Sequence, residues 1–338
     1  MYDRRNKIGG NIMTYEEKLQ QYKDWIFRRS AYQMALAIIS IDKQTVAPSA
    51  GAAYRDERSA YLAGELFSIE TDPAMVQLLK ELKDDPQIDG DNKRAVELYY
   101  KQAMDTMCIP KEEFVAYQKL RDESFDAWIK AKSQSDYSIF EPYLKKIIEV
   151  SKKMYRYRNS DKNLYDQMLD DYEPGMTQEK YDVFFAALKE RLVPLIQKIT
   201  QAKQKNEAFL HQEFPIEDQK KFMTQLLDYL HFDSSWGYQN ESEHPFTSWT
   251  CENDCRTTTK YVKNDVISAV LSTVHEVGHA YYEHNVDPKY DGMILSEGIS
   301  SGMHESQSRL CENYLARTTA FWKYHYPKLQ ETFPTQLG

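Results

Sequence analysis

The stretch 265–284, DVISAVLSTVHEVGHAYYEH, decides how this chain is organised. Its apolar residues recur at helical spacing, which predicts a helix beginning at Asp265 and ending near His284. Within it, HEVGH at 275–279 fits the pattern H-E-x-x-H, whose two histidines lie on one face of a helix. Two such imidazoles can bind one Zn²⁺, and Glu276 between them can work on a metal-activated water. The stretch therefore predicts a metal-binding helix beside an apolar stripe that faces the core.

Helical periodicity continues outward from this stretch over most of the chain. Further helices are predicted at 14–41, 52–69, 73–83, 89–106, 110–132, 138–158, 177–209, 215–231 and 295–317. Between 232 and 261 the periodicity stops, and alternation around 255–261 predicts one or two strands. We expect a mainly α protein with a small β element beside the H-E-x-x-H helix. Residues 14–338 are expected to form a single domain, and residues 1–13 an N-terminal extension.

Composition narrows the classes of function. The chain has 338 residues and a formal net charge of −9, which argues against a nucleic-acid partner because phosphates need a positive field. No apolar run approaches the roughly 20 residues that span a bilayer, so no membrane partner is expected. The N-terminus shows no hydrophobic signal region, and the four cysteines are expected to be free thiols. These features predict a cytoplasmic protein.

The two histidines need a third protein ligand. The carboxylates that follow them along the chain are Glu283, Glu297, Glu305 and Glu312. Glu283 lies one turn further along the same helix, a poor position for closing a tetrahedron. Glu297 and Glu305 are expected to share one face of the predicted helix 295–317, so spacing leaves the choice between them open.

Several motifs taken together resemble one family. HEVGH is followed by HESQS at 304–308, and it is preceded by HPF at 244–246 and by DCRTT at 254–258, which is similar to a D-x-R-x-T element. This combination resembles the M32 family of zinc carboxypeptidases, over roughly residues 15–320. The resemblance implies that Glu305, the glutamate of HESQS, is the third metal ligand and that Glu297 assists on the same face.

The resemblance also implies an activity. We expect a metallocarboxypeptidase that removes the C-terminal residue of peptides, with Glu276 as general base. One Zn²⁺ per chain is expected, or another divalent metal such as Co²⁺. His244 is expected to donate a hydrogen bond near the metal. Arg256 is expected to pair with the substrate carboxylate or, alternatively, to form a salt bridge with Asp254 on the same strand face. A homodimer is a further expectation from the family.

The length of the chain departs from the family pattern. Family members continue well past the HESQS helix, whereas this sequence stops at Gly338. We therefore expect the C-terminal part of the family fold to be missing and the groove to be open on one side. Two alternatives remain: a metallo-oligopeptidase or endopeptidase with the same ligands, and an inactive truncated fragment that acts only as a binding module.

Overall fold

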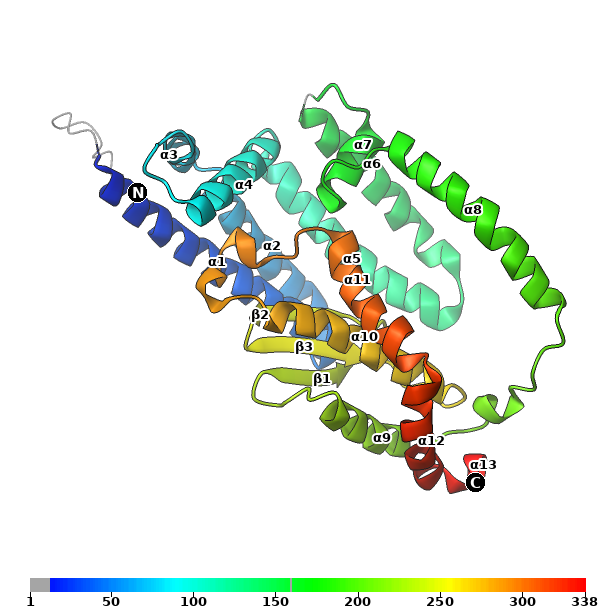
Figure 1. Ribbon diagram of the computed structural model, residues 1–338. Coiled ribbons are helices and arrows are strands. Elements are labelled where there is room, and N and C mark those ends of the chain that lie inside the picture. Colours follow the sequence, from blue (N-terminus) through cyan, green and yellow to red (C-terminus); the bar gives the residue numbers. More distant parts are fainter. Residues whose placement is uncertain (1–12, 159) are drawn as a thin grey trace.

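The computed structural model describes residues 13–158 and 160–338, and helices dominate it (Figure 1). The helices are α1 (Tyr15–Thr45), α2 (Ala52–Glu70), α3 (Pro73–Lys83), α4 (Gly90–Thr106), α5 (Lys111–Gln134), α6 (Glu141–Tyr157), α7 (Leu164–Tyr172), α8 (Gln178–Gln201), α9 (Ile216–Tyr229), α10 (Val266–His284), α11 (Ser301–Arg309), α12 (Thr319–Thr332) and α13 (Pro334–Leu337). The predicted extension at 1–13 lies outside the described residues except for Met13, and the single-domain organisation stays a prediction.

Three short strands form one sheet in the order β1-β3-β2. The strands are β1 (Gly237–Glu241), β2 (Thr247–Cys251) and β3 (Asp254–Thr259). β3 pairs parallel with β1 and antiparallel with β2. The helix α10 packs along this sheet (Figure 1). The expected mainly α fold with a small β element beside the H-E-x-x-H helix is confirmed.

The buried side chains gather in two apolar clusters. One joins α1, α3 and α4, with Tyr22, Leu79 and Leu82 fully enclosed. The other joins α9, β3, α10 and α12, and it holds the apolar stripe of α10. Burying an aliphatic side chain stabilises the fold by about 1.5–3 kcal/mol, so the second cluster holds α10 firmly in place.

The start of α10 is set by its own sequence. The carboxylate of Asp265 accepts a hydrogen bond from the backbone N–H of Ser268 at 2.9 Å and caps the helix. Val266, Val270 and Val274 follow at helical spacing and are completely buried. Because this stripe faces the core, the adjacent row that carries His275 and His279 lies at the edge of the buried region.

Two of the predicted helices differ from the structure, one in its end and one in its continuity. The helix expected at 177–209 ends at Gln201. The single helix expected at 295–317 is wrong: a short 3₁₀ turn (Ile294–Ser296) is followed by α11 and then by a π-helix (Leu310–Ala316). Glu297 lies in extended backbone between the first two elements, with φ −76° and ψ 150°. The periodicity of apolar side chains does not reveal such a break, because the break depends on how α11 packs against α10.

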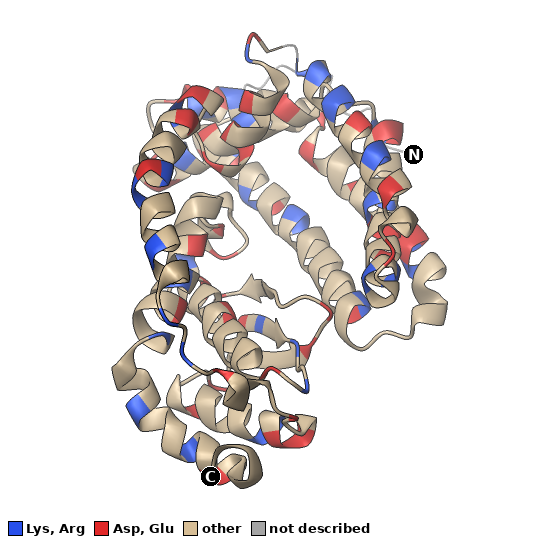
Figure 2. Cartoon of the chain, turned by 90° about the vertical axis from the view of Figure 1, so that its right-hand side faces the viewer, with Lys and Arg blue, Asp and Glu red and all other residues tan. Residues whose placement is uncertain are grey.

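The charged residues are spread along the helices rather than gathered in one block. Figure 2 shows Lys and Arg interspersed with Asp and Glu along the helices. Over residues 13–158 and 160–338, no helix is both long enough and apolar enough to cross a membrane.

Candidate metal centre

A glycine lets α11 lie against the motif helix. A Cβ placed on Gly278 would stand 2.8 Å from the Cα of Ser308 and 2.9 Å from the carbonyl oxygen of Gln307. These are backbone atoms, which cannot rotate away. The absence of a side chain at the fourth position of HEVGH therefore brings α11, and the carboxylate of Glu305 with it, close to α10.

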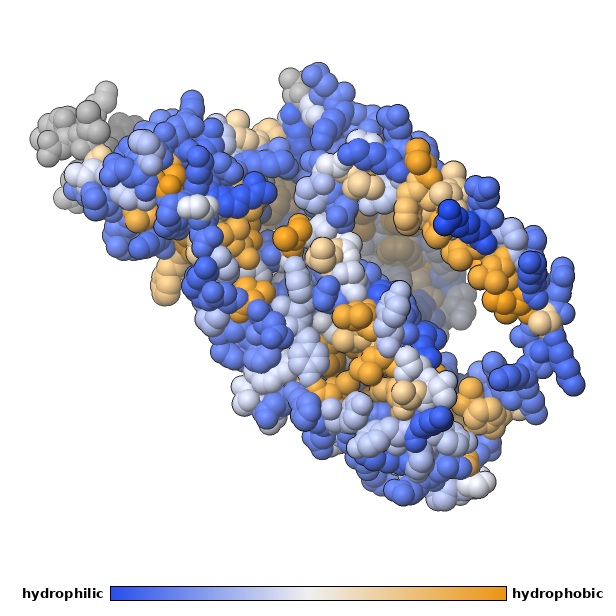
Figure 3. Space-filling view, viewed as in Figure 1, coloured by the Kyte–Doolittle hydropathy of each residue, from blue (hydrophilic) through white to orange (hydrophobic). Residues whose placement is uncertain are grey.

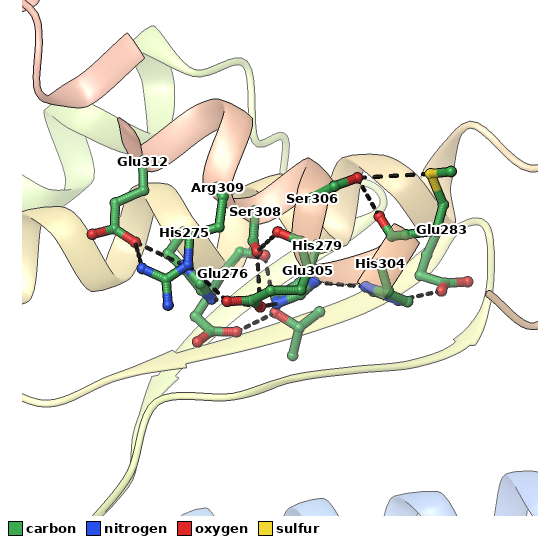
Figure 4. Close-up of polar contacts among 12 residues, drawn as sticks. His275, Glu276, His279, Glu283, His304, Glu305, Ser306, Ser308, Arg309 and Glu312 are labelled. Carbon is green, nitrogen blue, oxygen red and sulfur yellow. Dashed lines mark hydrogen bonds and ion pairs between the residues drawn. The ribbon is translucent and has the colours of Figure 1, made fainter. Parts of the chain in front are cut away.

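Three donor side chains meet between these two helices (Figure 4). One oxygen of Glu305, Oε2, lies 3.3 Å from Nε2 of His279 and 3.5 Å from Nε2 of His275. The ligand atoms of all three side chains lie within 4.8 Å of one another. Two imidazole nitrogens and one carboxylate oxygen are a donor set typical of catalytic zinc sites.

The other ring nitrogen of each histidine is also engaged. Nδ1 of His275 lies 3.0 Å from Oε2 of Glu312. Nδ1 of His279 lies 2.6 Å from Nδ1 of His304, whose Nε2 lies 2.7 Å from Oε1 of the buried Glu283. Both histidines thus turn Nε2 toward Glu305 and Nδ1 toward an outer partner. Outer partners of this kind fix the ring orientation and tautomer of a metal-binding histidine.

His279 is held in the form that can bind a metal. Burial, followed by the nearby charges of His304 and His275, lowers the pKa of His279 to about 4. Its imidazole is therefore neutral at pH 7. Neutral imidazole is the form in which histidine binds metals.

Glu305 is held as a carboxylate. Burial pushes its pKa upward, but the hydrogen bond from Arg309 and the charge of His275 outweigh burial and leave the pKa below its ordinary value. Arg309 Nε donates to Oε1 at 2.7 Å, and the Ser308 hydroxyl donates to Oε2 at 3.1 Å. The site thus presents a charged oxygen to the two Nε2 atoms.

Glu276 lies beside the three donors but has a different environment. It is buried, and its Oε2 accepts a hydrogen bond from the hydroxyl of Thr247 at 2.7 Å. The same hydroxyl lies 2.9 Å from the backbone oxygen of Glu276, which ties β2 to α10. Burial raises the pKa of this carboxyl group, and the hydrogen bond from Thr247 opposes that effect. A buried carboxyl group next to a metal site is positioned to exchange a proton.

The donors open into a cavity with a volume of about 1110 Å³. Its lining includes all three donors, Glu276 and His244. Four cations also line it: Lys132, Lys260, Arg309 and Arg317. Each of them is paired with a glutamate of the same wall. The cavity is large enough to take a short peptide segment.

The two expected substrate-binding residues lie in different places. His244 lines the cavity, and its ring meets Trp128 edge-on at 6.4 Å between centroids. Arg256 is not among the described residues that line it. Its guanidinium forks onto Asp254, with Nε to Oδ1 at 2.7 Å and Nη2 to Oδ2 at 2.8 Å. The role of Arg256 in substrate binding therefore stays a prediction that this geometry does not favour.

The other carboxylates considered as the third ligand lie outside the group of three donors. Glu297 lines the cavity, yet its carboxylate lies 3.9 Å from Arg29, and it does not share a helix with Glu305. Glu283 and Glu312 contact His304 and His275 from outside the donor group. Sequence reasoning missed this outer arrangement, although the seven-residue step from Glu305 to Glu312 places both on one helix face.

The sequence comparisons define the class of protein. Residues 21–338 match the family described as Carboxypeptidase Taq (M32) metallopeptidase. The chain is 37% identical over 328 residues to "Carboxypeptidase 1" of Bacillus subtilis, which covers 96% of this chain and 65% of the relative. It is 31% identical over 320 residues to "Thermostable carboxypeptidase 1" of Thermus thermophilus, covering 90% and 63%. The chain therefore belongs to the M32 metallopeptidase family, as its motifs indicated.

Solved structures agree with this assignment. The structure described as "BsuCP Crystal Structure" superposes with a TM-score of 0.91 at 37% identity, covering 94% of this chain and 65% of that one. The "Crystal structure of M32 carboxypeptidase from Deinococcus radiodurans R1" gives 0.85 at 30% identity, covering 95% and 64%. The chain thus spans a little under two thirds of the length of these relatives. Membership of a metallopeptidase family also indicates a divalent metal.

Proposed function

We propose that this chain binds one Zn²⁺ through His275, His279 and Glu305 and serves the removal of C-terminal residues from peptides. One observation carries the proposal: both Nε2 atoms face the same carboxylate oxygen, while both Nδ1 atoms are engaged by outer partners. Histidines that merely pack in a core have no reason to share one oxygen in this way. The names of the relatives support the carboxypeptidase activity.

The residues fit a zinc ion by the chemistry of their donors. Two imidazoles and one carboxylate match the His₂Glu set of zinc peptidases, which leaves one position for water or substrate. When bound, the metal polarises the scissile carbonyl and lowers the pKa of a water molecule. Cobalt(II) accepts the same donors, so it is expected to replace zinc.

Glu276 has the geometry of the proton carrier. Its Oε2 accepts a hydrogen bond from Thr247, and its Oε1, to which no described residue donates, would take a proton from the attacking water. The same oxygen would then deliver that proton to the leaving amine. Glu276 directly follows His275 on the motif helix, so its side chain points to a different side of the helix. It therefore lies beside the three donors without being one of them.

The cavity offers partners for the rest of the substrate. His244 of the HPF segment is proposed to donate to the polarised carbonyl oxygen. The terminal carboxylate is proposed to bind a cation of the wall, such as Arg309 or Lys260, in exchange for part of its present glutamate pairing. A cytoplasmic location and a homodimer stay predictions from the sequence.

The metal assignment is tested by titrating metal-free protein with Zn²⁺ in a calorimeter. One ion per chain is expected, and Glu305→Gln is expected to weaken its affinity at least 100-fold. Glu297→Gln is the matched control, since Glu297 lines the same cavity beside Arg29. Equal losses in the two variants, or none in Glu305→Gln, would reject the ligand assignment.

The activity is tested with two peptides that differ only at the C-terminus, one with a free carboxylate and one amidated. Stepwise shortening of the free peptide alone is expected, with the products followed by mass spectrometry. Internal cleavage of both peptides would favour the endopeptidase alternative. Zinc binding without cleavage of either would favour the binding module.

A further inference from the structure

A second group of metal-ligand atoms lies at the turn between β2 and β3. The thiol sulfur of Cys251, a carboxylate oxygen of Glu252 and one of Asp291 lie within 4.8 Å of one another. Cys251 ends β2 and carries a free thiol, whereas Asp291 follows the 3₁₀ turn Pro288–Tyr290 that comes after α10. Two segments far apart in the sequence thus bring three possible ligands together, and none of the three belongs to the candidate metal centre.

The carboxylate of Glu252 lacks a positively charged partner. Its Oε2 is buried and has no hydrogen-bond partner among the described residues, and its Oε1 accepts a hydrogen bond from the neutral amide of Asn253 at 2.5 Å. A buried carboxylate is tolerated when it is paired, protonated or bound to a metal.

The neighbouring carboxylate of Asp291 sharpens this need. Partial burial, followed by the hydrogen bond and the charge of Glu252, raises the pKa of Asp291 to about 6. Asp291 is therefore still largely ionised at pH 7. Two adjacent carboxyl groups repel each other when both are ionised, so this pair has to share a proton or hold a cation.

The surroundings of the pair favour a cation. The group lines a cavity of about 200 Å³ between α1, β2 and the loop after α10. Four carboxylates line this cavity: Glu252, Glu283, Asp291 and Glu297. No Lys, Arg or His of the described residues lines it, and Glu283 and Glu297 already contact His304 and Arg29. Figure 3 shows mostly hydrophilic residues on the side of the molecule that carries α1 and this loop.

The types of the ligand atoms select the ion. Ca²⁺ and Mg²⁺ prefer sites built from oxygen alone, whereas a thiolate together with carboxylates suits Zn²⁺. We propose that Cys251, Glu252 and Asp291 bind a zinc ion of their own, which ties the β2–β3 turn to the loop after α10. The turn is already held in place, because the backbone oxygen of Glu252 lies 2.7 Å from Nδ1 of His284. Three protein ligands leave a position for water, which reaches the site where Asp291 is exposed.

The proposal is tested by titrating the reduced, metal-free 338-residue chain with Co²⁺ and recording its absorption. Co²⁺ accepts the ligands of zinc sites, and a thiolate bound to it gives a charge-transfer band in the near ultraviolet. The candidate metal centre offers only nitrogen and oxygen, so it cannot give this band. A band equivalent to one thiolate per chain is expected, and Glu305→Gln is expected to keep it.

Two pairs of variants identify the ligands. Cys251→Ser is expected to lose the band, and Cys108→Ser, which removes a free thiol elsewhere, is expected to keep it. Asp291→Asn is expected to weaken Co²⁺ binding by about tenfold or more. Asp287→Asn is its matched control, because Asp287 lies in the same loop and pairs with Lys289. Circular dichroism checks that each variant folds, and the exposed position of Asp291 keeps its replacement away from the core.

Three outcomes would overturn the proposal. No charge-transfer band could develop with Co²⁺ in excess, which would leave the two carboxyl groups sharing a proton. The band could persist in Cys251→Ser, which would assign it to another cysteine. Asp291→Asn and Asp287→Asn could bind Co²⁺ equally well. None of these readouts depends on the candidate metal centre or on peptide cleavage, so the proposed function stands or falls separately.

Discussion

His279 reaches the buried carboxylate of Glu283 through a second imidazole, His304. The distances fit one arrangement of the two imidazole protons. His279 donates from Nδ1 to Nδ1 of His304, and His304 donates from Nε2 to Glu283. His279 then keeps the lone pair of Nε2 for a metal. We therefore expect His304 to be a positioning residue that would act on a bound metal through His279.

Removing this positioning residue should loosen the metal. We expect His304→Ala to weaken Zn²⁺ affinity by about 10–100-fold, because His279 loses the partner that sets its tautomer. Competition with a chelator measures the change. His284→Ala is the control, since His284 lies on α10 with His279 but its ring stacks on Trp236. Equal affinities in the two variants would contradict the role of His304.

Replacing Glu276 should abolish peptide cleavage without abolishing metal binding. We expect Glu276→Gln to retain Zn²⁺ within a few-fold and to lower any peptide cleavage by at least about 100-fold, since an amide cannot take a proton from water. Metal content and initial rates are measured on one preparation. Full activity in this variant would show that another group is the base.

At the scale of elements, the site depends on how closely α11 approaches α10. Gly278 permits that approach, and the π-helix that follows α11 carries Glu312 toward His275. Irregular turns of this kind occur frequently at functional sites. A missing side chain thus lets α11 approach α10 closely enough for His304 and Glu305 to contact His279 of the motif.

A side chain at this position should separate the two helices. We expect Gly278→Ala to lower the free energy of unfolding by about 1–3 kcal/mol, because the new Cβ meets the backbone of Ser308. Zinc affinity should fall as well, since Glu305 moves away. Urea unfolding and calorimetry measure both effects. Gly90→Ala is the control: no described atom lies within 4 Å of its Cβ, so no loss is expected. Equal stability of the two variants would contradict the close contact.

At the scale of the whole molecule, the last helices complete the core around α10. The rings of Phe214 and Phe333 meet edge-on with centroids 5.1 Å apart, although they are far apart in the sequence. In α12, His325 lies among aromatic rings of α9, is 1% exposed, and has no described hydrogen-bond partner at Nε2. Burial, and then the charge of Lys328, lowers the pKa of His325 to about 4.

This histidine should make the fold sensitive to acid. Above pH 6.5 it is neutral in both the folded and the unfolded chain, so it contributes no pH dependence. As the pH falls from about 6.5 toward 4, the unfolded chain takes up a proton that the folded chain excludes, and stability falls by about 1–3 kcal/mol. Urea unfolding of His325→Phe at pH 7.5 and 5 should show a smaller loss than the original chain. His211→Gln, at an exposed position, should keep the original slope; a similar slope in all three would contradict the assignment.

Much of this protein follows from local pattern. The helical ranges, the capped start of α10, and the two histidines and Glu276 on one helix depend on neighbours a few residues apart, which a sequence displays directly. The family followed from several short motifs taken together. The salt bridge of Arg256 with Asp254 was one of the two pairings that the alternation of this strand allowed, and the structure shows it. The break at Glu297 could not be predicted, because helical spacing does not show where contacts with other elements interrupt a helix.

The sequence by itself determined a mainly helical chain with two candidate ligands, a candidate base and a family. Spacing left Glu297 and Glu305 open and the family resemblance implied Glu305; the tertiary structure then placed the carboxylate of Glu305 beside both histidines. It also placed His304 behind His279 and left one face of α8 uncovered among the described residues. The physical reason is that these features depend on contacts between separate elements. Helical spacing fixes which way a side chain points, whereas the neighbour it meets is set by how closely whole helices pack.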